Sequence, residues 1–200
     1  MLKIYGDCRS GNCYKIQLVC ALLNIDYQWI AIDIMKGEAS SPAMLAKNPN
    51  GKIPLIEMDD GFVLTESNAI INYLAANTDC YPNNRETTAK IQQWQFFEQY
   101  SHEPYIAVAR FIKLYQGMPE SRIAEFEAKQ AGGIKALQLM EDHLKSSSFL
   151  VGDSMTTADI ALYAYTHVAH EGGFDLNNYP AIRSWINRIQ SLPTYKGMIN

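Results

Sequence analysis

The sequence has 200 residues, of which 48% are hydrophobic and 19% are charged. Disordered chains combine low hydrophobicity with a high net charge, and this chain has neither property. Its 17 basic and 21 acidic residues give a formal net charge of −4. This balance argues against a nucleic-acid-binding protein, which needs clustered lysine and arginine to displace counterions from phosphates.

Membrane insertion and secretion are not expected either. The longest mainly apolar run, residues 16–25, contains Gln17 and Asn24 and falls short of the roughly 20 residues that a membrane span requires. The first residues carry no basic stretch followed by an apolar run, so no signal peptide is expected. Four cysteines are ordinary usage for this length, which favours a reduced cytoplasmic protein.

Strand and helix patterns alternate in residues 1–77, and this range forms the first predicted domain. Strands are expected at 2–5, 27–34, 55–58 and 62–64, and helices at 14–23 and 67–76. The last two strands flank an Asp-Asp-Gly turn and therefore predict a hairpin. The order β-α-β-(loop or helix)-β-β-α predicts a small α/β sandwich.

Strand signals fade after this point. Residues 78–85 have the composition of a linker, and residues 86–200 form the second predicted domain, which is all helical. Helices are expected at 86–115, 121–145, 157–170 and 180–191. The pair Gly132-Gly133 falls inside one of them and is expected to kink or split it. The predicted fold class is therefore α/β plus all-α.

The segment Lys52-Ile53-Pro54 precedes a predicted strand. A proline at this place has no N–H for the sheet ladder and belongs at a strand start or an edge. If its peptide bond is cis, the N–H and C=O of Ile53 turn outward and can pair with a peptide. The alternative is an ordinary trans turn proline, which is the commoner form.

Glu66 and Ser67 stand where the last helix of the first domain is expected to begin. Ser67 is a good N-cap residue, and the plain alternative is that it only satisfies the end of the helix. A helix N-terminus with a hydroxyl is also a ready site for a carboxylate, and Glu66 can accept from an ammonium. Together they fit the head group of an α-amino acid.

A polar loop, residues 7–13, follows the first strand and contains Ser10 and Asn12. Ligands of open α/β sheets gather beyond the carboxyl ends of strands, so this loop is well placed. Its hydroxyl and amide donors lie near the positive end of a helix and are suited to an anionic sulfur. Cys8 and Cys13 are too far apart for a C-x-x-C pair and lack zinc-like spacing. They are interpreted as loop or core residues, with reactive thiols as the alternative.

These three segments together resemble the cytosolic glutathione transferases, in particular their serine-type bacterial and theta-like members. The helical half is similar as well, because Thr156 and Asp159 match the family's capping box. The resemblance implies a thioredoxin-like N-terminal domain that holds glutathione. It also implies an all-helical domain that covers the second substrate.

Carried over to this sequence, the resemblance assigns Ser10, aided by Asn12, to stabilise the thiolate of glutathione. Tyr5 is the alternative sulfur contact, although its place inside a strand favours a packing role. The backbone of Ile53 would pair with the cysteinyl unit. Lys52 would meet the glycine carboxylate, with a solvated lysine as the alternative.

Glu66 and Ser67 would hold the γ-glutamyl head. For the second substrate His102, Tyr105 and Arg110 are candidates, with plain helix core as the alternative.

The implied function is conjugation of reduced glutathione to small hydrophobic electrophiles, as in detoxification, by a cytoplasmic homodimer. Glutathione is then a co-substrate, and no metal, other cofactor, nucleic acid or membrane is expected. Two alternatives stay open on the same fold. One is a glutathione-dependent disulfide reductase or isomerase, and the other is a non-catalytic, glutathione-binding regulatory protein.

Overall fold

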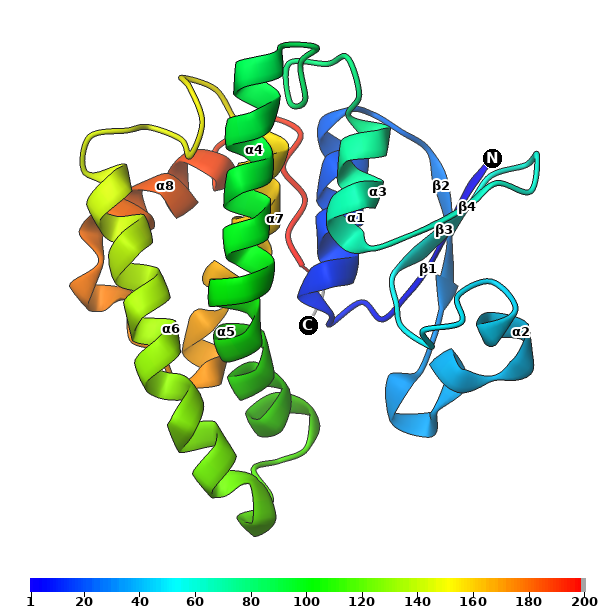
Figure 1. The fold of residues 1–200 in the computed structure, drawn as a ribbon, viewed down its shortest axis with the longest axis horizontal. Coiled ribbons are helices and arrows are strands. Elements are labelled where there is room, and N and C mark those ends of the chain that lie inside the picture. The colour runs from blue at the N-terminus through cyan, green and yellow to red at the C-terminus, as the bar shows by residue number, and fades with distance from the viewer. Residues whose placement is uncertain (199–200) are drawn as a thin grey trace. The chain divides into compact units, whose positions relative to one another are not determined.

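The computed structural model of this chain describes residues 1–198. They form two compact units, one built from residues 1–76 together with the segment from residue 193 on, the other from residues 77–192 (Figure 1). Each unit is considered by itself. Among the described residues, no helix has both the length and the apolar character needed to cross a membrane.

The first unit contains a mixed four-stranded sheet in the order β2-β1-β3-β4. Its strands are β1 (Leu2–Gly6), β2 (Tyr27–Ala31), β3 (Leu55–Glu57) and β4 (Val63–Thr65). Strand β2 runs parallel to β1, whereas β3 is antiparallel to both β1 and β4. The predicted hairpin is confirmed, and Gly61 at its turn has a φ of 85°, which glycine adopts without a steric penalty.

Helices cover both faces of this sheet. Helices α1 (Gly11–Leu22) and α3 (Ser67–Leu74) lie side by side on one face (Figure 1). A Cβ added to Gly6 would lie 2.8 Å from the Cys13 sulfur, so α1 approaches the end of β1 closely. The other face packs a cluster of Ile32, Ala39, Met44 and Leu55. That cluster is closed by two 3₁₀ turns, η1 (Ile34–Lys36) and η2 (Glu38–Ser40), and by α2 (Pro42–Leu45).

Helix α1 begins earlier than the apolar spacing predicts. Ser10 has an extended backbone, and its Oγ accepts a hydrogen bond from the Cys13 N–H at 3.4 Å, which makes it the N-cap. Gly11 and Asn12, taken as loop residues from the sequence, therefore lie in the first helical turn.

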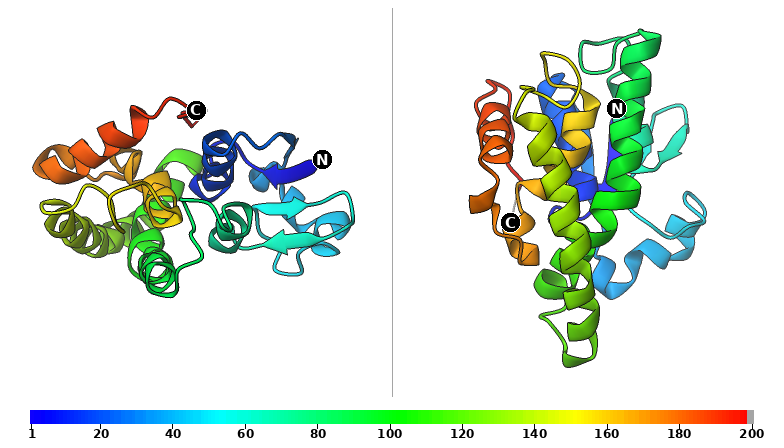
Figure 2. Two further views of the ribbon diagram at one scale, coloured as in Figure 1. Left: turned by 90° about the horizontal axis from the view of Figure 1, so that it is seen from above. Right: turned by 60° about the vertical axis from the view of Figure 1, so that its left-hand side comes forward.

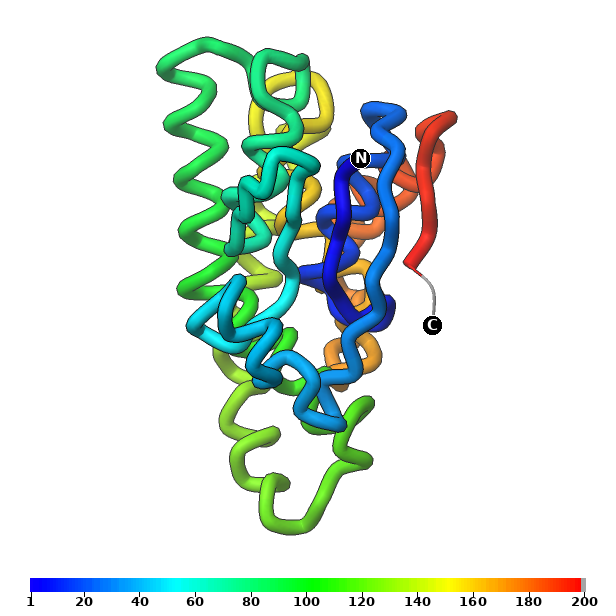
Figure 3. Tube along the Cα trace, turned by 90° about the vertical axis from the view of Figure 1, so that its right-hand side faces the viewer, coloured from blue at the N-terminus to red at the C-terminus, as the bar shows by residue number. Residues whose placement is uncertain are grey.

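The chain returns to the first unit after the helical one. The Tyr14 hydroxyl donates to the Lys196 carbonyl oxygen at 2.6 Å, and Lys196 Nζ donates to the Tyr27 hydroxyl at 3.0 Å. Figure 3 shows this last segment alongside β2. The sequence assigns all of 86–200 to the helical domain, whereas here the residues from 193 on pack with the sheet unit. Tertiary hydrogen bonds of this kind leave no periodic pattern in the sequence.

The second unit is helical throughout (Figure 2). Its α-helices are α4 (Arg85–Phe97), α5 (Glu103–Arg110), α6 (Ile123–Leu144), α7 (Thr157–Thr166) and α8 (Pro180–Gln190). The sequence predicts one helix over 86–115. In the structure this region also contains two π-helical stretches, η3 (Glu98–His102) and η4 (Phe111–Tyr115). Short 3₁₀ turns complete the unit: η5 (Glu120–Arg122), η6 (Ala169–Gly172) and η7 (Leu176–Asn178). Every residue of α7 is buried, so this helix forms the centre of the unit.

The expected break at Gly132-Gly133 is wrong, because α6 runs through both residues. A Cβ on Gly132 would overlap the ring of Tyr105, and one on Gly133 would overlap the ring of Phe174. The glycines are needed for close packing against aromatic rings and not for a bend in the helix.

The capping box at the start of α7 is confirmed. Asp159 Oδ2 accepts from the Thr156 N–H at 2.9 Å, while the Thr156 side chain accepts from the N–H of Asp159. Asp159 Oδ1 accepts in addition from the Leu150 N–H and from Trp185 Nε1, both at 2.9 Å. This fully buried carboxylate therefore ties α7 to the preceding loop and to α8.

Replacing Asp159 by alanine tests this role. Asp159→Ala leaves several buried donors without a partner, each at a cost of roughly 1–3 kcal/mol, so we expect a loss of about 3–5 kcal/mol in the free energy of unfolding. Urea unfolding followed by circular dichroism measures it. The exposed Asp153 of the same loop is the matched control, and Asp153→Ala should change stability by less than about 0.5 kcal/mol. Equal effects of the two variants would contradict the assignment.

Candidate functional site

Strand register gathers the three candidate segments at one end of the sheet. Tyr5 of β1 pairs with Leu55 of β3, and Leu55 pairs in turn with Thr65 of β4. Because β3 is antiparallel to its neighbours, the start of β3 lies beside the ends of β1 and β4. The residues that follow β1, precede β3 and follow β4 therefore come together, and these are 7–12, 52–54 and 66–67.

Ser10 and Asn12 lie at the positive end of the α1 dipole. As N-cap, Ser10 uses an oxygen lone pair to accept from Cys13. Its hydroxyl hydrogen takes no part in that bond and can point to a ligand. Both residues are half-buried, so part of each is exposed.

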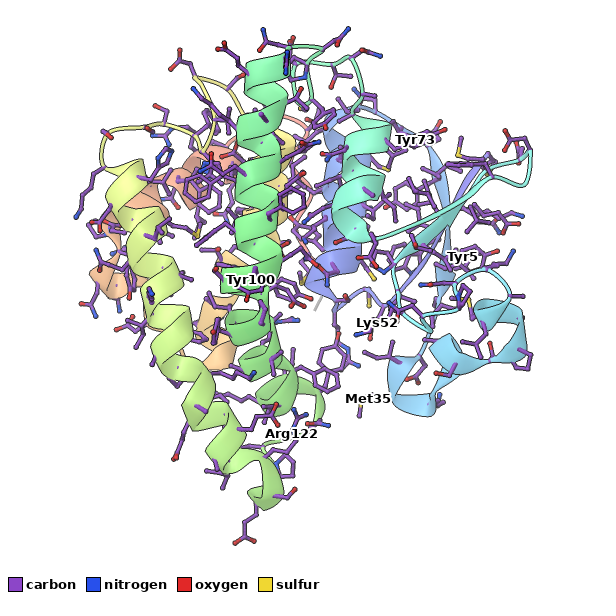
Figure 4. The ribbon with its side chains drawn as sticks, viewed as in Figure 1. Tyr5, Met35, Lys52, Tyr73, Tyr100 and Arg122 are labelled. Atoms are coloured by element: carbon purple, nitrogen blue, oxygen red, sulfur yellow. The ribbon has the colours of Figure 1, made fainter. Side chains whose placement is uncertain are left out.

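The Ile53–Pro54 peptide bond is cis. Within residues 1–198 the N–H and C=O of Ile53 have no hydrogen-bond partner. The loop before them is held by the buried Asn48, whose Nδ2 donates to the Lys52 carbonyl oxygen at 2.8 Å and whose Oδ1 accepts from the Asn50 N–H at 3.1 Å. The Lys52 side chain is exposed on this loop (Figure 4). Asn48 was not among the sequence candidates, although its place in Asn-Pro-Asn-Gly is typical of an Asx turn.

Glu66 adopts an uncommon backbone conformation, with φ 67° and ψ 111°. For a residue with a Cβ, such a conformation costs roughly 1–3 kcal/mol and is most often found at functional sites. It lets β4 pass directly into α3 and leaves the Glu66 side chain exposed. Ser67 is the first residue of α3, so its interpretation as the N-cap is wrong. The N–H groups of this first turn have no acceptor within the helix and lie at the same sheet end.

A buried polar cluster joins α1 to α3. Ser67 Oγ donates to Asn12 Oδ1 at 3.3 Å and accepts from Lys15 Nζ at 3.2 Å. The same ammonium donates to Asn68 Oδ1 at 3.2 Å. Lys15 is 0% exposed, and sequence reasoning missed it because it lies within the apolar stretch of a predicted helix. A lysine at a core-facing position was the signal that could have found it.

The Tyr5 hydroxyl, the alternative sulfur contact, bonds to a carboxylate in this structure. This hydroxyl donates to Glu57 Oε2 at 2.6 Å, and Lys47 Nζ lies 3.0 Å from the same oxygen. The hydrogen bond to Glu57, with burial, raises the pKa of Tyr5 to about 12. The bonds from Tyr5 and Lys47 lower the pKa of Glu57. The phenol hydrogen is therefore engaged on the sheet, where Figure 4 places the ring.

Burial raises the pKa of two thiols of α1 and so lowers their reactivity. Cys13 is 0% exposed, and burial raises the pKa of its thiol to about 12. Burial likewise raises the pKa of Cys20 to about 12. These values favour the interpretation of Cys13 as a core residue over that of a reactive thiol.

The candidates for the second substrate lie within the packing of the helical unit. His102 is 0% exposed and its Nε2 lies 2.9 Å from Thr166 Oγ1. Arg110 is 2% exposed and forms an ion pair with Glu171. The ring of Tyr105 covers the backbone of Gly132. These contacts support the plain-core alternative.

Comparison with known proteins finds relatives that match both units of the chain. Residues 4–83 match the N-terminal domain of glutathione S-transferases, and residues 94–193 match the C-terminal domain. The structure of a glutathione S-transferase from Pseudomonas fluorescens superposes with a TM-score of 0.97 at 55% identity, covering 100% of this chain and 99% of that one.

Two more distant relatives are described as an oxidoreductase and as a transferase. A disulfide-bond oxidoreductase of Escherichia coli is 30% identical over 92% of this chain and 88% of its own. The glutathione transferase URE2P6 of Phanerochaete chrysosporium, solved in complex with oxidized glutathione, has a TM-score of 0.86 at 26% identity, covering 96% of this chain and 92% of that one.

A four-stranded mixed sheet followed by a helical unit defines a two-domain protein with a thioredoxin-like first half. The chain belongs to the glutathione S-transferase family. The predicted family and fold class are thereby confirmed, as is the expectation of a glutathione-binding enzyme of this family.

The low reactivity of the Cys13 and Cys20 thiols can be tested by alkylation. At pH 8 a thiol with a pKa of about 12 is almost wholly protonated, and the thiolate is the nucleophile. We expect iodoacetamide to leave Cys13 and Cys20 unmodified in the folded protein and to modify both after unfolding in urea. Mass spectrometry of tryptic peptides reads out each site. Rapid labelling of Cys13 in the folded protein would show that it is a reactive thiol.

Proposed function

We propose that this protein conjugates the thiolate of reduced glutathione to small hydrophobic electrophiles. In this proposal glutathione lies extended along the sheet end, with its cysteinyl unit paired to the backbone of Ile53. The observation that carries the proposal is the register that gathers the starts of α1, β3 and α3. It supplies an outward-facing backbone, a carboxylate site and a hydroxyl donor to one peptide-sized ligand.

Ser10 would stabilise the thiolate, and Asn12 would assist it. A free thiol has a pKa of about 8.5. A hydrogen bond to a charged group contributes roughly 1.5–3 kcal/mol, and one pKa unit corresponds to about 1.36 kcal/mol. The Ser10 hydroxyl would therefore lower the pKa of the bound thiol by about one to two units. Ser10 acts as a donor to sulfur in this scheme and not as a nucleophile.

The two ends of glutathione would be held by charged groups of the same unit. The first turn of α3, with Ser67, suits the γ-glutamyl carboxylate, and the exposed Glu66 can accept from the γ-glutamyl ammonium. Lys52 is exposed and would meet the glycine carboxylate. We extend the proposal to a cytoplasmic homodimer with a role in detoxification, as the family resemblance implies.

The Ser10 role has a distinct pH signature. Ser10→Ala removes the donor to sulfur, so the pKa of bound glutathione should rise by about one to two units. Conjugation at pH 6.5 should then fall by about 10- to 50-fold, because the thiolate fraction falls by that factor, and the loss should shrink as the pH passes the new pKa. Ultraviolet titration of the bound thiolate measures the shift. Tyr5→Phe is the control and should leave the titration unchanged, because the Tyr5 hydroxyl donates to Glu57. An unchanged titration in Ser10→Ala would disprove the role of Ser10.

A second function is favoured by one relative, the disulfide-bond oxidoreductase of Escherichia coli. Glutathione-dependent disulfide reduction would use the same thiolate against a disulfide in place of a carbon electrophile. Two assays on one preparation separate the reactions, an aryl-halide conjugation assay and a mixed-disulfide reduction assay. We expect conjugation to have the higher kcat/KM. Disulfide reduction without conjugation would reverse the assignment, and glutathione binding with neither activity would favour a regulatory protein.

A further inference from the structure

Lys15 is placed unusually for a lysine. Its side chain is 0% exposed although it carries an ammonium group, and lysine is almost never fully buried without dedicated partners. The ammonium donates to Ser67 Oγ and to Asn68 Oδ1, each at 3.2 Å. Both of these acceptors are neutral, and both belong to the first turn of α3.

Lys15 determines how the Ser67 hydroxyl is used. An ammonium can only donate hydrogen bonds, so the Ser67 oxygen must accept from Lys15 and its own hydrogen must point elsewhere. In the structure that hydrogen is donated to Asn12 Oδ1 at 3.3 Å. An ionised carboxylate is a stronger acceptor than an amide oxygen. A carboxylate that reaches the start of α3 would therefore compete with Asn12 Oδ1 for this hydrogen, which is not used in the bond with Lys15.

The charge of Lys15 acts in the same direction. A carboxylate bonded to Ser67 Oγ would lie roughly 5–6 Å from the ammonium, two hydrogen-bond lengths in a bent arrangement. Charges at this distance interact strongly when they are shielded from solvent. The ammonium also adds to the positive end of the α3 dipole.

We propose that Lys15 is a positioning residue that, acting through Ser67, makes the start of α3 selective for a carboxylate. This inference rests on the proposed function, in which the carboxylate is that of the γ-glutamyl unit. Lys15 does not touch the ligand in this scheme. Lys15 instead orients the Ser67 hydroxyl, which contacts the ligand, and places a positive charge close to the bound carboxylate.

Two ligands and one substitution test the proposal by calorimetry. One ligand is glutathione, and the other is γ-aminobutyryl-cysteinyl-glycine, which lacks only the γ-glutamyl carboxylate. The wild-type protein should bind glutathione at least about 10-fold more tightly than the analogue. In Lys15→Met the Kd of glutathione should rise about 10-fold while that of the analogue stays the same. Methionine keeps the length of the apolar stem, and circular dichroism checks that the variant is folded before its binding is compared.

A matched control separates this role from a general loss of binding. Lys52→Met also removes a lysine, but both ligands keep the glycine carboxylate that Lys52 is proposed to meet. This variant should therefore weaken both ligands equally. Lys15→Gln, which retains a donor without the charge, is the second variant and should lie between wild type and Lys15→Met.

The outcomes distinguish this inference from the proposed function. If the wild-type protein binds no glutathione, the proposed function fails. If Lys15→Met and Lys15→Gln keep the full preference for glutathione, only the inference on Lys15 fails. If the wild-type protein binds glutathione and the analogue equally well, the inference fails together with the proposed γ-glutamyl carboxylate site, whereas glutathione binding itself stands. An equal weakening of both ligands, or failure of both variants to fold, would assign Lys15 to the fold alone and would also overturn the inference.

Discussion

The antiparallel pairing of β3 with both of its neighbours is the constraint on which the candidate site depends. Tyr5, Leu55 and Thr65 lie in one row across three strands. Because of this register, three segments that are far apart in the sequence lie next to one another at one end of the sheet. A shift of register by one residue would reverse every side chain of β3. Leu55 would then leave the core cluster that it forms with Ile32 and Met44, so hydrophobic packing holds the site together.

The polar cluster of Lys15, Ser67 and Asn12 connects the helices that carry the candidate site. It joins the first turns of α1 and α3, which carry the proposed sulfur donor and the proposed carboxylate site. Buried polar groups are tolerated when their hydrogen bonds are satisfied, and satisfied networks hold a unique geometry. The same bonds that hold the two helices in place therefore preorganise the polar atoms that a ligand would meet.

Sequence reasoning succeeded where the pattern is local. The hairpin of β3 and β4 and the capping box of Thr156 and Asp159 depend on residues a few positions apart, and both were predictable. It failed where a distant partner decides the outcome. The Gly132-Gly133 pair was expected to break α6, but the rings of Tyr105 and Phe174 explain the glycines. The plain alternative for Ser67 was a helix cap, yet its hydroxyl bonds to Lys15 and Asn12.

The amino-acid sequence alone determined the order of strands and helices, the family and the residue types that a glutathione site needs. These follow from periodicity, turn chemistry and short motifs, which act over a few residues. Only the tertiary structure decided the strand register, the engagement of the Tyr5 phenol by Glu57 and the burial of Lys15. Each of these joins residues far apart along the chain, and such contacts exist only once the helices have packed on the sheet.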